Sequence, residues 1–430
     1  MNELDTHVCI IGAGVSSLCT SIQLIRNYNT RNFTIIEKTN QLGGTWSINT
    51  YLGGGCDWSE KFALQPEILA YLKGLAAKYG LEEDIRYGTA HSRSKLLVSA
   101  VGGLSVPKEC ELPTASEFKG GLFHSALWDH SFDWKNKDIV VVGNGCSATQ
   151  FVPVMSRGGG YGATGAKKSI VQFANQAHWL AERENPTYSP FFKWVLRWVP
   201  HVMRTYRWCL YWDMEKDFRA FGIESGVSYR ADEQAIKERY IRENAPRRTL
   251  ISFVPKSDIG RKRRVYDTDY LASLHCENIE LVYEDPVKEI FADGVRTKSG
   301  RVIPADAIIL ATGFQTQAGL APMEVYGQGG ISVNEHWKQV SEGTRSAYFG
   351  TCLAGFPNFF LMMGPNTLSG HLSVIYTTEC QVNFIMRVIK PIIKSLNKKK
   401  LKTIVESVAV MAEAEAKDID ETQAKASKLV

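Results

Sequence analysis

The sequence lacks the features that mark secreted proteins and proteins that bind zinc or nucleic acid. Its nine cysteines are odd in number and scattered, and no Cys-x-x-Cys pair occurs, which argues against a disulfide framework or a zinc site. The net charge of +5 is slight for 430 residues, so no nucleic-acid partner is expected. A glycine loop begins at Gly12, which leaves no room for a signal peptide before it. These absences favour reduced thiols and a cytoplasmic protein, and they leave the oligomeric state open.

Long uninterrupted apolar runs are also missing. One aromatic-rich stretch, FFKWVLRWVPHVMRTYRWCLYW, starts at Phe191 and contains a central proline and the cations Lys193, Arg197, Arg204 and Arg207. Such a segment favours a buried or surface-packed pair of helices over a stable membrane insertion. The length of 430 residues predicts two or three domains, and a composition of 44% hydrophobic and 22% charged residues predicts a globular protein with a substantial core.

The segment HVCIIGAGVSSLCTSIQL has the pattern of a short buried strand, a glycine turn and a helix. Gly12 permits the tight turn, and Gly14 lets a pyrophosphate approach the backbone at the helix N-terminus. Ser17 replaces the third glycine of the G-x-G-x-x-G pattern and is small enough to keep the helix close to the strand. A second strand, NFTIIEK, ends at Glu37, whose carboxylate can accept hydrogen bonds from a ribose diol and would repel a 2′-phosphate. The first loop is therefore predicted to bind FAD or NAD.

A second segment, KDIVVVGNGCSATQFVPVM, repeats this architecture. Gly143 and Gly145 form the turn, and Ala148 replaces the third glycine. The strand that follows, in SIVQFANQAHWL, ends without an acidic residue, so nothing there would repel a 2′-phosphate, and NADP is favoured. A third buried strand, ADAIILATGF, is expected to return the chain to the first site, where Thr312 and Gly313 allow close backbone approach to FAD.

Together these segments predict an α/β flavoprotein with two dinucleotide-binding domains, each built on a Rossmann-like parallel sheet, and with a helical insertion. The first part of the FAD-binding domain is assigned to residues 1–134. The NADP-binding domain is assigned to residues 135–310, with the helical insertion at about 185–250. Residues 311–430 are assigned to the second part of the FAD-binding domain and a C-terminal helical tail.

Two longer patterns resemble those of type I Baeyer–Villiger monooxygenases, within the wider group of flavin-containing monooxygenases. FKGGLFHSALWD matches F-x-G-x-x-x-H-x-x-x-W at Phe118, Gly120, His124 and Trp128. GGTWSINTYLGGGCD matches A/G-G-x-W-x-x-x-x-F/Y-P-G/M-x-x-x-D, with Leu52 in place of the proline. The resemblance runs from about residue 7 to the C-terminus, and its GFPNFFLMMGPN segment is similar to the family's flavin-ring segment.

The resemblance implies an FAD- and NADPH-dependent monooxygenase that inserts one oxygen atom from O2 into a ketone through a C4a-peroxyflavin. It also implies three catalytic residues. His124 is implied to couple the cofactor site to the relative motion of the two domains. Arg263 is implied to stabilise the peroxide anion and to contact the nicotinamide, and Asp57 to hold Arg263 through a charge-assisted pair. Without the resemblance, His124 is interpreted as a half-buried linker histidine, and residues 261–264 as a solvated basic cluster.

The predicted cofactor-contacting residues come from the two loops, the two family patterns and the basic cluster. They are Gly12, Gly14, Ser17, Glu37, Lys38, Gly44, Thr45, Trp46, Asp57, Gly143, Gly145, Ser147, Ala148, Lys262, Thr312, Gly313 and Asn366, with Lys262 implied to bind the 2′-phosphate of NADP. No metal ligand is predicted. The expected reactants are O2 and a small-molecule ketone or soft nucleophile. Three other residues are expected to be structural: His371 in a cap or in packing, and Met362 and Met363 in the core.

The sequence departs from the family pattern in three places. GGGCDWSEKF is shorter than the family's Ser/Tyr/Phe-rich segment, TAHSRSK cannot supply the usual strand pair, and relatives continue beyond ETQAKASKLV with an aromatic-rich tail. Exposed strand edges are therefore expected in the FAD domain. Asn175 also stands where relatives often carry an arginine for the 2′-phosphate. Two alternatives stay open: an S- or N-oxygenating flavin monooxygenase, and a catalytically impaired flavoprotein paralogue that lacks parts of the active site.

Overall fold

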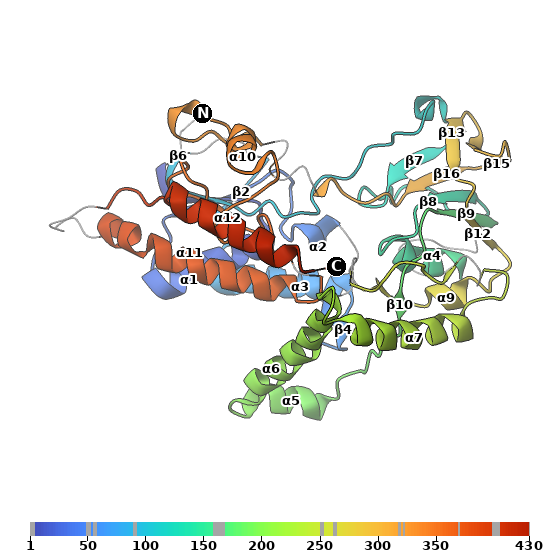
Figure 1. Ribbon diagram of the computed structural model, residues 1–430, viewed down its shortest axis with the longest axis horizontal. Coiled ribbons are helices and arrows are strands. Elements are labelled where there is room, and N and C mark those ends of the chain that lie inside the picture. The colour runs from blue at the N-terminus through green and yellow to red at the C-terminus, as the bar shows by residue number, and fades with distance from the viewer. Residues whose placement is uncertain are drawn as a thin grey trace.

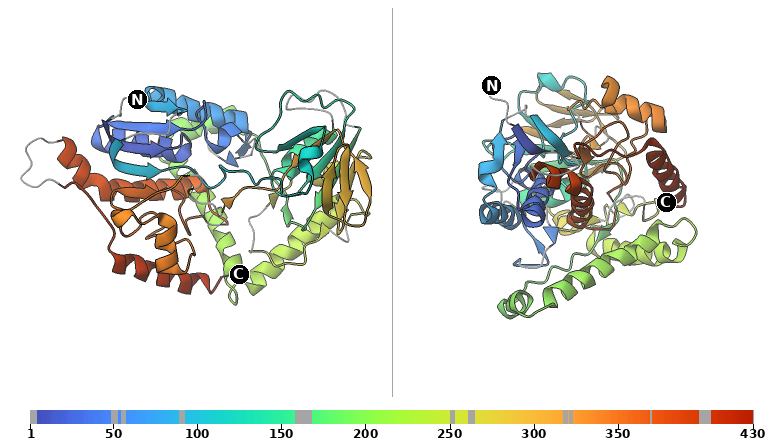
Figure 2. Two further views of the ribbon diagram at one scale, coloured as in Figure 1. Left: turned by 90° about the horizontal axis from the view of Figure 1, so that it is seen from above. Right: turned by 90° about the vertical axis from the view of Figure 1, so that its left-hand side faces the viewer.

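The computed structural model describes residues 5–48, 53–54, 58–88, 93–157, 168–249, 253–260, 265–316, 320, 323–368, 370–397 and 405–429. These residues form two lobes and a helical arm (Figure 1). Both ends of the chain contribute to the first lobe, and the middle of the chain forms the second lobe and the arm. Two extended connections run between the lobes (Figure 2).

The first lobe is built on a five-stranded parallel sheet with the order β17-β6-β1-β2-β5. The central strand β1 (Asp5–Ile11) pairs with β2 (Phe33–Glu37) and with β6 (Arg93–Ser99). Their apolar residues are buried on both faces of the sheet, as a parallel sheet covered on each side requires. Among the described residues, the sheet ends at β5 (Ile85–Tyr87) and β17 (Phe359–Leu361), and the shortness of these strands limits the unpaired edge.

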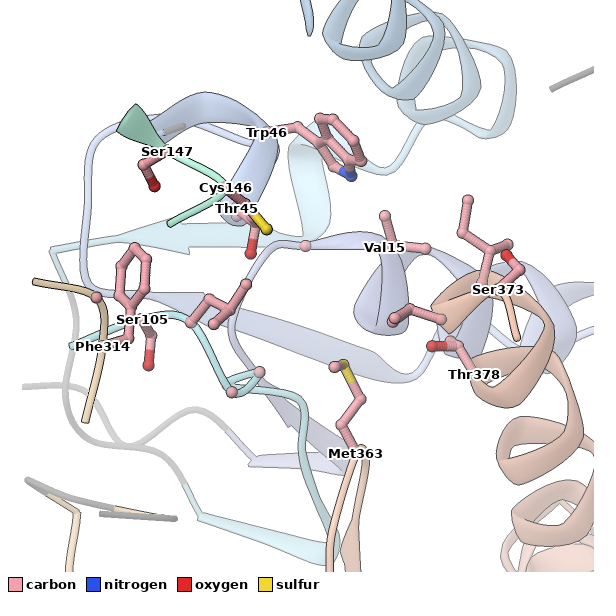
Figure 3. Close-up of a pocket in the computed structure, with 18 of the residues that line it drawn as sticks. Val15, Thr45, Trp46, Ser105, Cys146, Ser147, Phe314, Met363, Ser373 and Thr378 are labelled. Carbon is pink, nitrogen blue, oxygen red and sulfur yellow. The ribbon is translucent and has the colours of Figure 1, made fainter. Parts of the chain in front are cut away.

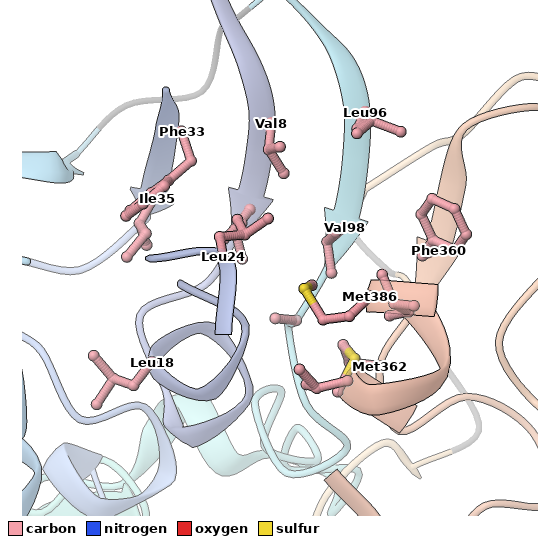
Figure 4. Packing of buried hydrophobic residues seen from close by; sticks show 14 of the residues in the cluster. Val8, Leu18, Leu24, Phe33, Ile35, Leu96, Val98, Phe360, Met362 and Met386 are labelled. Carbon is pink, nitrogen blue, oxygen red and sulfur yellow. The ribbon is translucent and has the colours of Figure 1, made fainter. Parts of the chain in front are cut away.

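Helices from distant parts of the sequence pack on this sheet. Helix α1 (Val15–Tyr28) follows the first glycine loop, and α11 (Val374–Asn397) packs against it. Figure 4 shows the shared core, which includes Val8, Leu18, Leu24, Phe33, Ile35, Leu96, Val98, Phe360, Met362 and Met386. The first lobe therefore cannot form from the N-terminal segment alone, because β17 and α11 complete its core.

Shorter elements complete the first lobe. They are α2 (Thr45–Ile48), β3 (Gly53–Gly54), β4 (Phe62–Ala63), α3 (Gln65–Tyr79), η1 (Glu82–Asp84), η5 (Gln328–Gly330), α10 (Val333–Ser341) and α12 (Ala412–Ala426). A buried polar contact joins α10 to α12: His336 Nε2 lies 3.1 Å from both carboxylate oxygens of Glu415. Since a buried carboxylate needs such partners, this contact fixes where α12 lies on the lobe.

The second lobe contains a second five-stranded parallel sheet, with the order β12-β9-β8-β16-β7. Its strands are β7 (Gly121–His124), β8 (Asp138–Val142), β9 (Ser169–Ala174), β12 (Ile279–Tyr283) and β16 (Ala307–Leu310). Helices α4 (Ala148–Ser156) and α9 (Tyr270–Ser273) belong to the core on one face. The core on the other face includes an antiparallel sheet made of β13 (Val287–Phe291), β14 (Gly294–Thr297) and β15 (Val302–Pro304). The segment that enters this lobe carries η2 (Ala115–Glu117).

The helical arm is inserted between β9 and β12. It consists of β10 (Leu180–Ala181), α5 (Pro190–Trp198), α6 (Val202–Glu215), η3 (Lys216–Phe221), α7 (Val227–Asn244) and β11 (Val265–Tyr266). No helix in the described ranges is both long enough and apolar enough to cross a membrane.

These elements confirm the predicted α/β class, with two Rossmann-like parallel sheets and a helical insertion. Strand β7 pairs with β16 in the second sheet, so the chain enters the second lobe before residue 134. The division into residues 1–134, 135–310 and 311–430 stays a prediction.

The first glycine of each loop is required by the same steric constraint. Gly12 has φ +103°, and a Cβ atom there would lie 2.7 Å from the Ala100 carbonyl oxygen. Gly143 has φ +113°, and its Cβ would lie 2.5 Å from the Ala311 carbonyl oxygen. Both conformations are in the region that favours glycine, and both contacts are too close for any side chain. In each sheet, the chain that leaves a neighbouring strand crosses directly over the loop.

We expect Gly143→Ala to lower the free energy of unfolding by roughly 1–3 kcal/mol, because alanine would be strained at this φ and would overlap the Ala311 carbonyl. Urea unfolding measures the change. Gly145→Ala is the matched control, because a Cβ at Gly145 meets no atom within 4 Å. Equal stability of the two variants would contradict the steric argument.

Candidate functional site

A cavity of about 2730 Å³ lies where the two lobes and the helical arm meet. Its walls include both glycine loops, residues 100–105 and 311–314 of the two connections, and parts of α6 and α11. Figure 3 shows Thr45 of the first lobe close to Cys146 and Ser147 of the second loop, with Met363, Ser373 and Thr378 on the other side. The two loops therefore open into one shared space.

The first loop forms a close-packed backbone cradle. Gly44 has φ +56°, and a Cβ there would lie 2.9 Å from the Gly14 Cα. The buried carboxylate of Glu37 closes the cradle, since Oε2 accepts a hydrogen bond from the Ala13 amide (2.7 Å) and Oε1 accepts one from the Thr39 amide (2.9 Å). The acid at the end of β2 thus lies against the glycine turn, on the cavity wall.

The second glycine loop is held in place by buried side-chain hydrogen bonds that the sequence analysis did not predict. Gln172 Nε2 donates to the Gly143 carbonyl (2.9 Å), and its Oε1 accepts from the Tyr270 hydroxyl (2.7 Å). Asn144 Nδ2 donates to the Gln176 carbonyl (2.6 Å) at the cavity wall. Burial raises the pKa of Tyr270, so its hydroxyl stays protonated and remains a donor. The only signal in the sequence was a polar Gln172 inside an apolar strand.

Two connections cross between the lobes beside the cavity. The Lys108 amide donates to the Gly313 carbonyl (3.0 Å), and the Gln315 amide donates to the Val106 carbonyl (2.9 Å). One connection follows β6 of the first sheet and the other follows β16 of the second. Any change in the angle between the lobes must therefore bend or shift these two hydrogen-bonded connections.

His124 lies next to this crossing and is buried behind the cavity wall. Its Nδ1 accepts from the Ala126 amide (3.1 Å), and its ring lies edge-on to Phe314, with 5.7 Å between the centroids. Its Nε2 is buried and has no hydrogen-bond partner within the described ranges. Burial lowers the pKa of His124 from 6.5, while the nearby Gly313 backbone acts in the opposite direction. The imidazole is therefore favoured in its neutral form.

Trp128 anchors the segment that follows His124. Its indole ring stacks on Trp134 at 5.3 Å between centroids, and it meets Phe123 and Phe151 edge-on. These rings belong to the core of the second lobe. The histidine segment is thus fixed to the second lobe at one end, while His124 touches the connection that returns to the first lobe.

The wall nearest to α11 is shaped by a buried amide. Gln381 Oε1 accepts from the Met363 amide (2.9 Å), and its Nε2 donates to Thr351 Oγ1 (3.0 Å). After β17, the chain places Met362 in the core, as predicted. Met363 lines the cavity, so the prediction of a core position is wrong for Met363.

His371 packs as expected, and it also lines the cavity. Its ring lies against Phe218 and Phe221, with centroid distances of 5.3 and 5.5 Å. Its Nε2 lies 3.4 Å from Glu215 Oε2 of α6. The ring packing joins the first lobe to the helical arm beside the cavity, since His371 Nε2 and Glu215 Oε2 have no hydrogen-bond partner in the described ranges.

Most of the predicted cofactor residues lie on the wall of this one cavity. They are Gly12, Gly14, Glu37, Lys38, Gly44, Thr45, Trp46, Gly143, Gly145, Ser147, Thr312 and Gly313. Ser17 and Ala148 are fully buried behind the loops, where Ser17 Oγ donates to the Gly12 carbonyl. Asn366 is exposed and does not line the cavity. Asp57, Lys262 and Arg263 lie outside the described residues. No metal-binding group of three His, Cys, Asp or Glu side chains occurs in the described ranges.

The sequence is similar to those of a nucleotide-binding family and of known monooxygenases. Residues 10–71 match the model of a family described as an NAD(P)-binding Rossmann-like domain. The chain is 30% identical to an FAD-binding monooxygenase, ktnD, of Aspergillus niger, over 93% of this chain and 71% of that protein. It is 31% identical to a Baeyer–Villiger monooxygenase of Pseudomonas aeruginosa, over 89% of this chain and 77% of that protein. The chain belongs to the Baeyer–Villiger monooxygenase family. The resemblance inferred from the two sequence patterns is thereby confirmed.

Solved structures of cyclohexanone monooxygenase and steroid monooxygenase share the fold. An open crystal structure of cyclohexanone monooxygenase superimposes with a TM-score of 0.82 at 20% identity, over 99% of this chain and 94% of that one. An oxidized steroid monooxygenase bound to NADP gives a TM-score of 0.81 at 23% identity, over 99% of this chain and 91% of that one. The whole described chain, with both lobes and the arm, therefore shares the fold of these two monooxygenases.

The pKa of His124 predicts a pH-dependent stability. The folded protein binds this proton less readily than the unfolded chain, whose histidine titrates near 6.5, so stability is retained above that pH and is lost as the pH falls below it. We expect the melting temperature of the wild type to fall more than that of His124→Gln between about pH 8 and about pH 5. Thermal unfolding across this range measures the difference, and parallel curves would exclude His124 as the cause.

Proposed function

We propose that this chain uses FAD and NADPH to insert one oxygen atom from O2 into a ketone and so form an ester or lactone. Membership of the Baeyer–Villiger family supports the reaction class. The observation that carries the proposal is that two independent glycine loops, on two separate sheets, open into the same cavity. A site of this kind brings two dinucleotides together, as transfer of a hydride between them requires.

The residues of the first loop fit FAD. Gly12, Gly14 and Gly44 line the cavity with backbone and without side chains, so a pyrophosphate can approach the start of α1. Glu37 would hold the ribose hydroxyls, and it is already placed at the end of β2 by two backbone-linked hydrogen bonds to Ala13 and Thr39.

The residues of the second loop fit NADP. Gly143 keeps the turn tight, Gly145 is open to the cavity, and Ser147 precedes α4, whose N-terminus favours an anion. Asn175 and Gln176 line the cavity after β9, where an acid would oppose a 2′-phosphate. The buried Gln172 and Tyr270 keep this loop in place.

When bound, the flavin supplies the chemistry of hydride acceptance and oxygen activation. The protein must orient both cofactors, exclude water and balance the negative charge that develops during oxygen transfer. We assign the orienting role to the two loops and a hinge role to His124, which touches the connection between the lobes at Phe314. His124 acts on the positions of the loops and is a positioning residue, because it does not reach the cavity.

The visible spectrum of the purified protein, taken before and after anaerobic NADPH, tests the proposal. We expect flavin bands that bleach faster with NADPH than with NADH, and conversion of a cyclic ketone to a lactone when O2 is admitted. Formation of sulfoxide or hydroxylamine products alone would instead support S- or N-oxygenation. A colourless protein that cannot be reconstituted with FAD would support an impaired paralogue and contradict the proposal.

Arg263 is proposed as the cation that balances the developing charge, with Asp57 and Lys262 in the roles implied by the family. We expect Arg263→Ala to lower the rate of ketone oxygenation by about 100- to 1000-fold, the usual effect of removing one charge-stabilising donor, while FAD stays bound. Steady-state product formation and the flavin-to-protein absorbance ratio measure the two effects. Arg296→Ala is the control, because Arg296 forms an exposed ion pair with Glu289 on the antiparallel sheet. Equal activity of both variants would remove Arg263 from the mechanism.

A further inference from the structure

Helices α5 and α6 form a hairpin that extends below both lobes, with α5 at its outer end (Figures 1 and 2). The hairpin has a small core of its own. The Tyr188 and Tyr206 hydroxyls lie 2.6 Å apart, and Phe192 packs against both rings at 5.1 and 5.4 Å between centroids. Leu196, one turn further along α5, is buried. Phe192 and Leu196 therefore lie on the face of α5 that packs against the rest of the protein.

The opposite side of α5 carries an aromatic stripe that this core does not use. Phe191, Trp194 and Trp198 are 73%, 55% and 67% exposed. At 100° per residue, the spacing i, i+3 and i+7 places the three side chains on one face of the helix. Phe191 and Trp194 stack at 6.3 Å between centroids. Three large exposed aromatic side chains on one helix face indicate an interaction surface.

The cavity does not account for this stripe. Trp208 and Trp212 of α6 are also exposed, but they line the cavity together with Arg204. None of the three stripe residues of α5 lines it. The two helices thus present their aromatic residues to different places, α6 to the active-site space and α5 to the outside.

The charge around the stripe is of one sign. The only charged residues of α5 are the cations Lys193 and Arg197, whereas Arg204 and Arg207 of α6 line the cavity. Arg207 is paired with Glu379 of α11 (3.1 Å), and Arg197 lies on α5 beside the stripe. A second copy of the chain would bring like charges together, so self-association through this face is disfavoured. A surface with negative charge at its exterior and an apolar layer beneath is complementary to this aromatic and basic helix.

We propose that α5 docks the protein peripherally on an anionic lipid bilayer. Phe191, Trp194 and Trp198 enter the region between headgroups and acyl chains, where tryptophan is favoured, Arg197 beside them contacts lipid phosphates, and Lys193 on the other side of α5 adds to the attraction at longer range. The nine-residue helix lies in the plane of the surface and does not cross the bilayer. The docking does not depend on the identity of the reaction.

Co-sedimentation with vesicles tests this docking. The probes are vesicles of phosphatidylcholine alone and vesicles in which about a quarter of the lipid is phosphatidylglycerol. We expect binding to the anionic vesicles to be at least about tenfold stronger, to weaken with added salt, and to shift tryptophan emission to the blue. Absence of binding to anionic vesicles by the full-length protein overturns the proposal.

Paired substitutions separate the two contributions. Trp194→Ser with Trp198→Ser should lower vesicle binding at least about tenfold at every lipid composition. Lys193→Glu with Arg197→Glu should remove the preference for anionic lipid. Tyr326→Ser and Lys338→Glu are the controls, since both residues are exposed on the first lobe away from the arm, and they should bind as the wild type does.

Light scattering and the flavin spectrum complete the test. A concentration-dependent dimer that disappears in the tryptophan variant would show that the stripe is a contact between copies, and would overturn membrane docking. Flavin content and NADPH oxidation are measured on the same samples without vesicles. Because the stripe is outside the cavity, they should equal the wild-type values, so loss of docking and loss of the proposed activity are distinguished.

Discussion

The two close backbone contacts, Gly12 with Ala100 and Gly143 with Ala311, are the constraint on which the site depends. In each sheet, the chain that leaves a neighbouring strand passes over the glycine turn at a distance that excludes any side chain. That chain then becomes a connection to the other lobe. The crossing therefore fixes each loop against the connection between the lobes, and both loops line the same cavity.

The first lobe is also joined directly to the helical arm. The Lys61 amide donates to the Pro186 carbonyl (3.1 Å), the Tyr188 amide donates to the Ser59 carbonyl (2.8 Å), and Phe62 packs on Tyr266 at 5.1 Å between ring centroids. Residues 59–62 thus form the contact with the base of the helical arm. The cavity is bounded by the paired backbone crossing and by this bridge.

Two kinds of buried polar side chain serve the fold in different ways. Gln172, Gln381 and Glu37 hold backbone groups of the cavity wall, and their hydrogen bonds offset the cost of burying them. His124 differs, because its Nε2 is buried without a hydrogen-bond partner in the described ranges. A buried, neutral imidazole at a chain crossing can gain a partner when the lobes move, which is consistent with the hinge role proposed for it.

The sequence by itself determined the two Rossmann-like sheets, the first glycine of each loop, the acid after β2 and the family, because local strand–turn–helix patterns and long motifs carry that information. It also determined that the stretch from Phe191 forms two helices. Only the tertiary structure decided that Met363 faces the cavity while Met362 does not, that Gln172 holds the Gly143 loop, and that Asn366 stays outside. These depend on contacts between segments far apart in the chain, such as α11 with the turn after β17, for which sequence spacing contains no signal.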